Sequence, residues 1–273
     1  MKTKKEIKAL INQIRARRAL SCKSCGYSVC FSSRGREEVI CQWKWCRKRR
    51  SIWEETIFYK TRVKKITILQ ILDLWMNKMS LSAIKYVLNL KNRKIIWRVL
   101  KRVAAFLVPN YRKAEFTLGG KDIIVEVDES KFGRRKYNRG HRVNGVWVLG
   151  MVEKTPERKI KLIAVDDRSK ATLEEYLKNN VDTGSIIYTD GWRGYSGLGV
   201  IFSCHQTVNH SLNFKDPETG VHTNTIEGNW AGIKPSIAFR LRTKEKIDLY
   251  LTRYMLLRNE ECHPLEAIFK YLL

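Results

Sequence analysis

The order of apolar segments after Gly119-Gly120 limits most narrowly what this chain can fold into. Short β-branched runs, which are typical of strands, occur there beside longer segments of helical pattern. The predicted strands are 123–128, 145–152, 159–165 and 185–190, and the predicted helices are 169–179, 225–239 and 244–259. Three strands, a helix, a strand and then helices predict an α/β domain with a mixed sheet over residues 116–273.

The segments before residue 116 predict mainly helices. Residues 1–20 indicate a short basic helix, and residues 62–107 have a helical pattern that we expect Pro109 to end. Ser80 has the position of an N-cap. The last part of this stretch predicts a helix, a turn and a second helix, at 81–88, 89–91 and 92–106. We therefore predict a helical, helix-turn-helix-like DNA-binding segment over residues 61–115.

The basic charge of the chain is concentrated in its first 120 residues. The whole chain has 53 Lys and Arg against 27 Asp and Glu, a net charge of +26. Residues 1–120 have 29 basic and 7 acidic side chains, a net of +22, which leaves +4 for residues 121–273. This asymmetry favours nucleic acid as the partner, with a basic membrane-surface protein as the alternative. No run of 18 apolar residues and no apolar signal-peptide core occurs, so we expect an intracellular protein without a membrane partner.

Four of the seven cysteines have the spacing of a zinc site. Two residues separate Cys22 from Cys25, and four separate Cys41 from Cys46. Two thiolate pairs on short turns can complete a tetrahedron around Zn²⁺, although the second spacing is longer than usual. Four unconnected buried cysteines are the alternative. We predict a structural zinc module within residues 1–60. The other three cysteines are expected to be small buried apolar residues: Cys30, Cys204 and Cys262.

Two groups of basic and aromatic side chains are candidates for DNA contact. Cations neutralise phosphates, and aromatic rings among them can stack on bases. The first group surrounds the second cysteine pair and consists of Trp43, Lys44, Trp45, Arg47, Lys48, Arg49 and Arg50. The second group lies on the helix at 92–106, which can enter a major groove, and consists of Arg93, Lys94, Arg98, Lys101 and Arg102. The alternatives are tryptophans that pack the zinc module and a solvated helix face.

Three carboxylates are the candidates for chemistry. Asp128 and Asp190 each close a predicted strand, and Glu227 lies near the start of the predicted helix 225–239. Two adjacent parallel strand ends with a helix passing them would form an RNase H-like phosphoryl-transfer site. Clustered carboxylates repel one another unless cations bind them. They therefore imply two Mg²⁺ or Mn²⁺ ions, which would activate the attacking oxygen and stabilise the leaving oxygen.

Other acidic residues beside these strand ends have a simpler interpretation. Glu126 and Glu129 lie next to Asp128 in sequence, and Asp166-Asp167 ends the third predicted strand. Each is weighed as surface charge, because an acid at a strand end is more often solvated than catalytic.

Two residues follow Glu227 on the same helix face. Trp230 is three residues further along, and Lys234 is seven residues further. We expect Trp230 to support the site. Lys234 is either a phosphate-gripping point charge or an ordinary exposed lysine.

Several motifs of this region resemble the Merlin-type DDE transposases. They follow one another in the order found in that family, over roughly residues 60–270. The motifs are Val127-Asp128-Glu129-Ser130-Lys131-Phe132-Gly133, Gly145-Val146-Trp147-Val148-Leu149-Gly150, Tyr188-Thr189-Asp190-Gly191-Trp192-Arg193-Gly194-Tyr195, Val208-Asn209-His210, 214–220 and His222-Thr223-Asn224-Thr225-Ile226-Glu227-Gly228-Asn229-Trp230. The cysteine cluster is similar to the zinc-binding segment that these transposases often carry.

The resemblance implies an RNase H-like catalytic fold and cut-and-paste movement of a DNA element. The acidic triad of the family falls on Asp128, Asp190 and Glu227, although some bacterial relatives have Asn at the third position. His210 and His222 become candidates for active-site support, or for hydrogen bonds within their loop. Water would release a 3′-OH at an element end, and that 3′-OH would then attack target DNA.

The implied partners are double-stranded DNA, as terminal inverted repeats and target, and a second copy of the chain in a homodimer or larger assembly. In a eukaryotic host, the run Arg47–Arg50 would direct the protein to the nucleus; otherwise we expect it in the cytoplasm with the chromosome. Three rival functions stay open: a domesticated transposase that only binds DNA, a stand-alone RNase H-type nuclease, and a zinc-finger transcription regulator.

Overall fold

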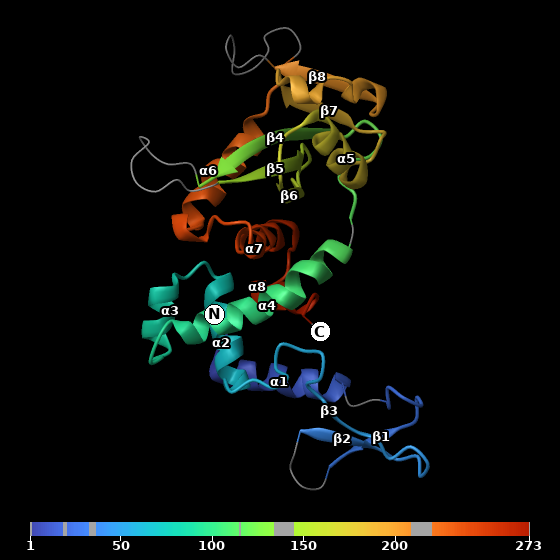
Figure 1. Cartoon of the computed structure of the whole chain (residues 1–273), viewed down its shortest axis with the longest axis vertical. Helices are drawn as coiled ribbons and strands as arrows, with labels where there is room; N and C mark the ends of the chain where they lie inside the picture. The colour runs from blue at the N-terminus through green and yellow to red at the C-terminus, as the bar shows by residue number, and fades with distance from the viewer. Residues whose placement is uncertain are drawn as a thin grey trace. The chain divides into compact units, whose positions relative to one another are not determined.

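The computed structural model describes residues 2–18, 21–32, 37–114, 116–133, 145–208 and 220–272. The chain forms two compact units (Figure 1). The first contains residues 1–110 and 263–273, and the second contains residues 111–262. Within the described ranges, no helix is long and apolar enough to cross a membrane.

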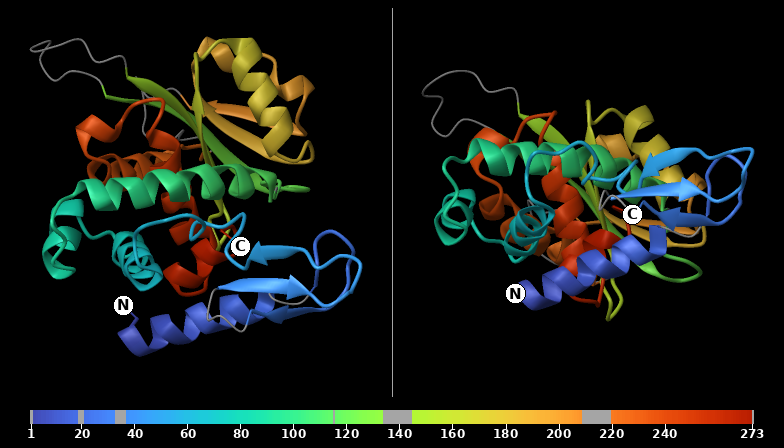
Figure 2. Two further views of the ribbon diagram at one scale, coloured as in Figure 1. Left: turned by 60° about the horizontal axis from the view of Figure 1, so that its bottom comes forward. Right: turned by 90° about the horizontal axis from the view of Figure 1, so that it is seen from below.

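The first unit begins with a helix and a small sheet. Helix α1 spans Lys4–Arg18. Strands β1 (Val29–Phe31), β2 (Glu38–Cys41) and β3 (Arg49–Ser51) pair antiparallel in that order, and Figure 2 shows them in light blue. The guanidinium of Arg15 lies 4.6 Å from the centre of the Phe31 ring, which connects α1 to β1. The strands were not predicted, because segments of three or four residues are too short to show a period.

Four further helices complete the first unit: α2 (Lys65–Met76), α3 (Leu81–Val87), most of α4 (Lys94–Lys113) and α8 (Pro264–Phe269). The predicted N-cap is confirmed, since Ser80 Oγ accepts a 3.2 Å hydrogen bond from the backbone N–H of Ala83. The prediction that Pro109 ends the following helix is wrong, because α4 continues to Lys113. Proline removes one helical hydrogen bond. The turn beyond it is held by the buried Tyr111, whose hydroxyl accepts a 3.1 Å hydrogen bond from Asn259 Nδ2.

The second unit is built on a five-stranded mixed sheet, which confirms the predicted α/β class. Its strands are β4 (Ile124–Phe132), β5 (Val146–Glu153), β6 (Ile160–Val165), β7 (Ile186–Asp190) and β8 (Cys204–Val208), in the order β6-β5-β4-β7-β8. Pairings among β6, β5 and β4 are antiparallel, whereas β4 with β7 and β7 with β8 are parallel. Strand β8 was not predicted, because its sequence Cys-His-Gln-Thr-Val is mostly polar.

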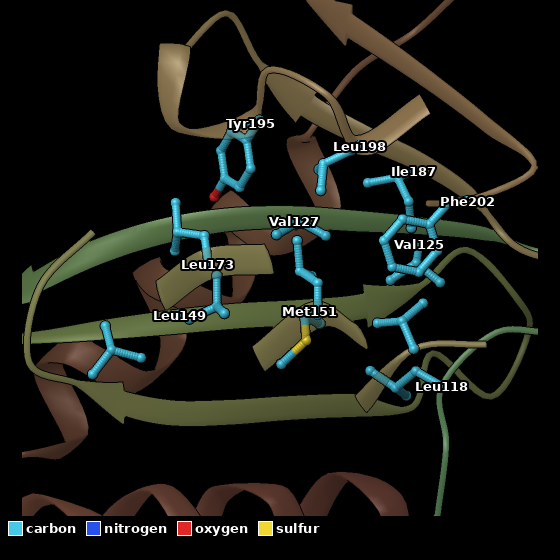
Figure 3. Packing of buried hydrophobic residues seen from close by; sticks show 13 residues of the cluster. Leu118, Val125, Val127, Leu149, Met151, Leu173, Ile187, Tyr195, Leu198 and Phe202 are labelled. Atoms are coloured by element: carbon cyan, nitrogen blue, oxygen red, sulfur yellow. The ribbon is translucent and has the colours of Figure 1, made fainter. Parts of the chain in front are cut away.

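The two faces of this sheet differ in chemistry. Val125 and Val127 are fully buried on one face, where α5 (Lys170–Asn180) contributes Leu173 and Leu177 to the same core. Figure 3 shows Leu173 and Tyr195 packed over β4 and β5. Because alternate side chains of a strand point to opposite faces, Glu126 and Asp128 share the other face. Helix α6 (Asn224–Ser236) lies there and ends one residue after Pro235.

Helix α7 (Ile247–Asn259) lies along the edge strand β6. The Asn259 side chain accepts a 2.9 Å hydrogen bond from the backbone N–H of Ile160 and donates another of 2.9 Å to its carbonyl. These bonds satisfy the backbone N–H and C=O of Ile160 at the edge of the sheet.

Candidate functional site

Asp128 and Asp190 stand at corresponding positions of neighbouring parallel strands. The β4–β7 ladder ends with Glu126 opposite Tyr188, and two more residues along each strand lead to Asp128 and Asp190. Asp190 is the last residue of β7, as predicted. Asp128 does not close its strand: β4 continues to Phe132, because its antiparallel pairing with β5 runs on to Phe132 opposite Val146. The parallel pairing therefore ends at the site while the antiparallel pairing passes it.

Helix α6 reaches Asp128 through the indole of Trp230. Trp230 Nε1 donates a 2.8 Å hydrogen bond to Asp128 Oδ2, and the backbone N–H of Glu129 donates another 2.8 Å bond to Oδ1. Gly150 is the β5 partner of Asp128, and a Cβ at that position would lie 2.6 Å from the Trp230 ring. A glycine is therefore required opposite Asp128 so that the indole can approach the carboxylate.

The pKa of Asp128 is raised from 3.8 to about 6. Burial is the largest cause, and the negative charges of Asp190 and Glu227 also raise it, while the Trp230 hydrogen bond opposes the change. Burial likewise raises the pKa of Glu129 to about 7, with further contributions from Asp128 and Asp190. The site is therefore a group of partly buried carboxylates that repel one another.

Glu227 lies in the first turn of α6, near the helix start as predicted. Its Oε1 accepts a 3.1 Å hydrogen bond from Thr223 Oγ1, and its side chain is exposed. Its charge is felt at Asp128, but in the described part of the chain the four clustered cysteines alone have ligand atoms that all lie within 4.8 Å of one another. The carboxylate oxygens of Asp128, Asp190 and Glu227 therefore do not all lie within 4.8 Å of one another, which agrees with the repulsion between their charges.

Glu126 is fully buried, so its interpretation as surface charge is wrong. Its Oε2 accepts hydrogen bonds from the backbone N–H groups of Thr225, at 2.8 Å, and Ile226, at 3.1 Å. Its Oε1 accepts a 2.8 Å bond from Thr225 Oγ1. The β-branched run that predicted β4 gave no indication of this role, because the donors lie about one hundred residues away in sequence.

His222 lies beside Glu126, in the loop before α6. Its Nδ1 lies 3.4 Å from Glu126 Oε1, and its Nε2 lies 3.0 Å from Lys154 Nζ. This agrees with hydrogen bonding at the loop before α6. His210 lies outside the described residues.

Positive charge surrounds the carboxylates on two sides. Near Asp128, the Nζ of Lys234 and the guanidinium of Arg242 lie 5.7 Å and 6.0 Å from the centre of the Phe132 ring. Partial burial lowers the pKa of Lys234, while the charge of Asp128 opposes this change. Lys234 is thus partly enclosed and close enough to sense Asp128, unlike an ordinary exposed lysine.

The second cationic group is a stack of alternating cations and rings that was not predicted. Arg168 lies 4.6 Å from the centre of the Trp147 ring and 4.0 Å from that of Trp192. Lys131 lies 5.2 Å from Trp147, and Arg193 lies 5.8 Å from Trp192. The backbone N–H of Trp192 donates a 2.9 Å bond to Asp190, so the stack adjoins the site. The residues are spread over four segments, and their proximity depends on the sheet.

Comparison with known proteins identifies the family. The sequence pattern of the ISXO2-like transposase domain matches residues 117–255, about half of the chain, and this stretch includes all three carboxylates. This chain belongs to the ISXO2-like transposase family. An uncharacterized transposase-like protein of Haemophilus influenzae is 32% identical to it over 94 residues, which are 34% of this chain and 75% of that protein. The family is that of insertion-sequence transposases, which act on DNA.

The four predicted zinc ligands of the transposase are close together. Sγ of Cys22 lies 3.8 Å from that of Cys46, and Sγ of Cys25 lies 3.5 Å from that of Cys41. A tetrahedron with Zn–S bonds of about 2.3 Å has S–S edges of about 3.8 Å. The longer second spacing is therefore compatible with zinc. Cys30 is exposed, so its expected burial is wrong.

The basic residues predicted to contact DNA differ in how they are engaged. Around the cysteines, Trp43 and Trp45 are 44% and 77% exposed, so these rings do not pack the module interior. On α4, Lys101 is exposed, whereas the Arg102 guanidinium donates to the backbone carbonyls of Thr56 and Tyr59. The other cations of this set are also exposed, namely Lys94 and Arg98 on α4 and Arg93 just before it, whose guanidinium donates a 3.2 Å hydrogen bond to Ser82 Oγ.

The cations within and just after the second cysteine pair are also mostly exposed, namely Lys44, Arg47, Lys48 and Arg49. Arg50 is partly buried, and its guanidinium donates a 3.0 Å hydrogen bond to the carbonyl of Ser21. Arg50 thereby connects β3 to the segment just before Cys22.

Proposed function

We propose that this transposase cleaves DNA at the ends of a mobile element and joins them to target DNA by a cut-and-paste reaction. Asp128, Asp190 and Glu227 are its proposed acidic triad. The observation that carries the proposal is the register of β4 and β7, which brings the two aspartates to one level beside α6. The sheet order supports an RNase H-like fold, and the motif order supports a Merlin-type member of the family.

Mg²⁺ or Mn²⁺ ions fit this set of oxygen donors, because burial and, to a smaller extent, neighbouring negative charges raise the pKa of Asp128, and a bound cation would stabilise its charged form. Two such ions, when bound, would activate the attacking oxygen and stabilise the leaving oxygen. The proposed ligands are Asp128, Asp190 and Glu227.

The chain's own residues orient the reactants. The Trp230 indole holds one oxygen of Asp128 in a fixed direction, and Lys234 with Arg242 provides positive charge for a phosphate next to it. The cation–ring stack at Arg168 provides a second contact for the DNA backbone beside Asp190. Positioning and electrostatics of this kind account for catalysis of phosphoryl transfer.

The first unit is proposed to bind the terminal inverted repeats. Its charge, the exposed Trp45 and the exposed cations of α4 suit contact with duplex DNA, and α3 with α4 is the proposed helix-turn-helix-like element. Zn²⁺ on the four cysteines has a structural role in this proposal. Two element ends are handled together, so we propose a homodimer or larger assembly.

The test uses labelled DNA that carries the ends of the element. Wild-type protein is incubated with Mg²⁺, with Mn²⁺ or with EDTA, beside a Glu227→Gln variant, which keeps the side-chain volume and removes the charge. Glu175→Gln is the matched control. Glu175 is also an exposed glutamate on a helix of the second unit, but its helix α5 lies on the opposite face of the sheet from α6. We expect metal-dependent cleavage by the wild type and the control, and binding without cleavage by Glu227→Gln.

Each other result has a definite meaning. End-specific binding without cleavage by the wild type would indicate a domesticated DNA-binding protein. Equal cleavage by wild type and Glu227→Gln would exclude Glu227 from the triad. Metal-dependent cleavage without preference for element ends would favour a stand-alone nuclease.

A further inference from the structure

We propose that Glu126 is a positioning residue, which sets the start of α6 and thereby holds Glu227 and Trp230 in register with Asp128. This inference rests on the proposed function, because it concerns how the proposed triad is assembled. Glu126 does not itself contact the reacting groups in this proposal. It acts through α6.

Helix α6 begins without a side-chain cap from its own N-cap residue. Thr223 occupies the N-cap position, but its side chain makes no capping hydrogen bond to the helix backbone. The first free N–H groups of a helix need acceptors, and a negative charge there is favourable. Glu126 of β4 provides both, since its Oε2 accepts from Thr225 N and Ile226 N. The cap of α6 thus comes from the sheet instead of the adjoining loop.

Because Glu126 caps α6, the hydroxyl of Thr223 can make a different hydrogen bond. Threonine at an N-cap ordinarily uses its hydroxyl to accept from the helix backbone. Here the Thr223 hydroxyl donates instead to Glu227 Oε1, at 3.1 Å. Capping by Glu126 therefore releases Thr223 to orient the carboxylate of Glu227.

Helix α6 is attached to β4 at two points, one on either side of Glu227. Glu126 binds the helix at Thr225 and Ile226, and Asp128 binds it at Trp230. Glu126 and Asp128 are two residues apart on one strand face, so roughly 7 Å of rigid backbone separates the two attachment points. The strand that contains Asp128 therefore fixes both the position and the rotation of the helix that contains Glu227.

The side chain of Glu126 is fully buried, although it has a carboxyl group. Burying a carboxylate is unfavourable unless hydrogen bonds compensate. The fully buried Glu126 accepts its hydrogen bonds from Thr225 and Ile226 of α6, and its ion-pair partner His222 lies in the loop just before that helix. The compensation that Glu126 receives is therefore tied to this one helix.

The experiment compares three substitutions at Glu126 with one at another buried glutamate of the sheet. Glu126→Ala removes the cap. Glu126→Gln keeps one oxygen for the two N–H donors and an amide for Thr225 Oγ1, so it is the conservative rescue. Glu153→Ala is the matched control: Glu153 is 7% exposed on β5, but its Oε1 accepts from Gly119 N, at 2.8 Å, and not from α6. Glu126→Asp, one methylene too short, replaces Glu126→Ala if the latter does not fold.

Three measurements are made on each full-length variant. Amide hydrogen exchange over residues 222–230 reports the start of α6. Titration with Mn²⁺ reports the triad independently of turnover. Only the Mn²⁺ binding that is lost in an Asp128→Asn variant is attributed to the triad. Cleavage of end-bearing DNA at saturating DNA reports the reaction.

We expect Glu126→Ala to raise exchange at 222–230, to weaken Mn²⁺ binding and to slow cleavage at least about tenfold, the usual size for a group that orients a metal ligand. Glu126→Gln should restore most of each value, and Glu153→Ala should match the wild type in all three. Equal Mn²⁺ affinity and cleavage in Glu126→Ala and Glu153→Ala would overturn this inference and leave the proposed function intact. A wild type that neither binds Mn²⁺ through Asp128 nor cleaves would overturn the proposed function, and this inference with it.

Discussion

The indole nitrogen of Trp230 donates a 2.8 Å hydrogen bond to Asp128 across 102 residues of sequence. The contact depends on Gly150, because a Cβ there would lie 2.6 Å from the ring. The candidate site is therefore a three-part arrangement in which β4 provides the carboxylate, β5 the space and α6 the donor. This relationship and three others lead to tests that separate local from tertiary effects.

Replacing Gly150 with alanine should push the Trp230 ring away from Asp128. We expect the variant to lose about 1–3 kcal/mol of unfolding free energy, as overpacked cores do, and to cleave DNA more slowly. Denaturant titration and the cleavage assay measure the two effects. Gly199→Ala is the control, since the nearest atom to its added Cβ is 3.7 Å away and its φ is not positive. Wild-type cleavage by Gly150→Ala would contradict the role given to this contact.

The metal-free protein should lose stability as the pH rises through the titration range of Asp128. Its pKa is 3.8 ordinarily and about 6 in the folded chain, so the folded state retains the proton that the unfolded chain releases. The stabilising effect of this proton is complete below about pH 4 and is lost by the time the pH has passed about 6.

An Asp128→Asn variant should remove the part of the pH dependence that is due to Asp128 and leave the part that is due to Glu129, whose pKa is raised to about 7. The pKa difference corresponds to about 3 kcal/mol in full, and partial exposure reduces the expected gain in unfolding free energy at pH 7 to roughly 1–2 kcal/mol. Thermal denaturation in EDTA at pH 4 and pH 7 measures it. An Asp128→Asn variant that is less stable than wild type at pH 7 would show that the charged carboxylate of Asp128 does not destabilise the folded protein.

The cysteine cluster should bind one zinc ion per chain. We expect Cys25→Ser to lose the metal and the hydrogen-exchange protection of residues 37–51, because little else holds these short strands together. Cys30→Ser is the control: Cys30 is exposed and lies outside the set of four. Zinc content is measured by metal analysis of the purified protein. A Cys25→Ser protein with a full complement of zinc would exclude the proposed ligand set.

Two adjacent cations of α4 should behave differently when replaced. Lys101 is exposed, so Lys101→Ala should weaken DNA binding and reduce the slope of log affinity against log salt by about 1. Arg102 donates to the carbonyls of Thr56 and Tyr59, so Arg102→Ala should instead destabilise the fold, by about 1–3 kcal/mol. Salt-dependent binding assays and denaturant titration separate the two effects. The reverse pattern would show that Arg102 is the DNA contact.

Local patterns predicted much of the architecture because they depend on neighbouring residues. The mostly apolar run before Asp190 predicted β7 and its end, and Ser80 predicted the start of α3. The extension of β4 to Phe132 was missed, because the residues after Asp128 are polar and are held in the strand by β5. The continuation of α4 through Pro109 was missed for a similar reason, since Asn259 helps to hold its last turn.

Local sequence was sufficient to predict the class of the sheet domain, the spacing of the four cysteines, the basic first 120 residues and the acids that lie at one level of β4 and β7. Each of these depends on residue type and on separations along the chain. The tertiary structure decided that Glu126 is a buried cap, that Gly150 faces Trp230 and that Arg168 lies between two tryptophans. Such contacts join segments tens of residues to about one hundred residues apart, and a side chain's burial and partners exist only after strands and helices have packed.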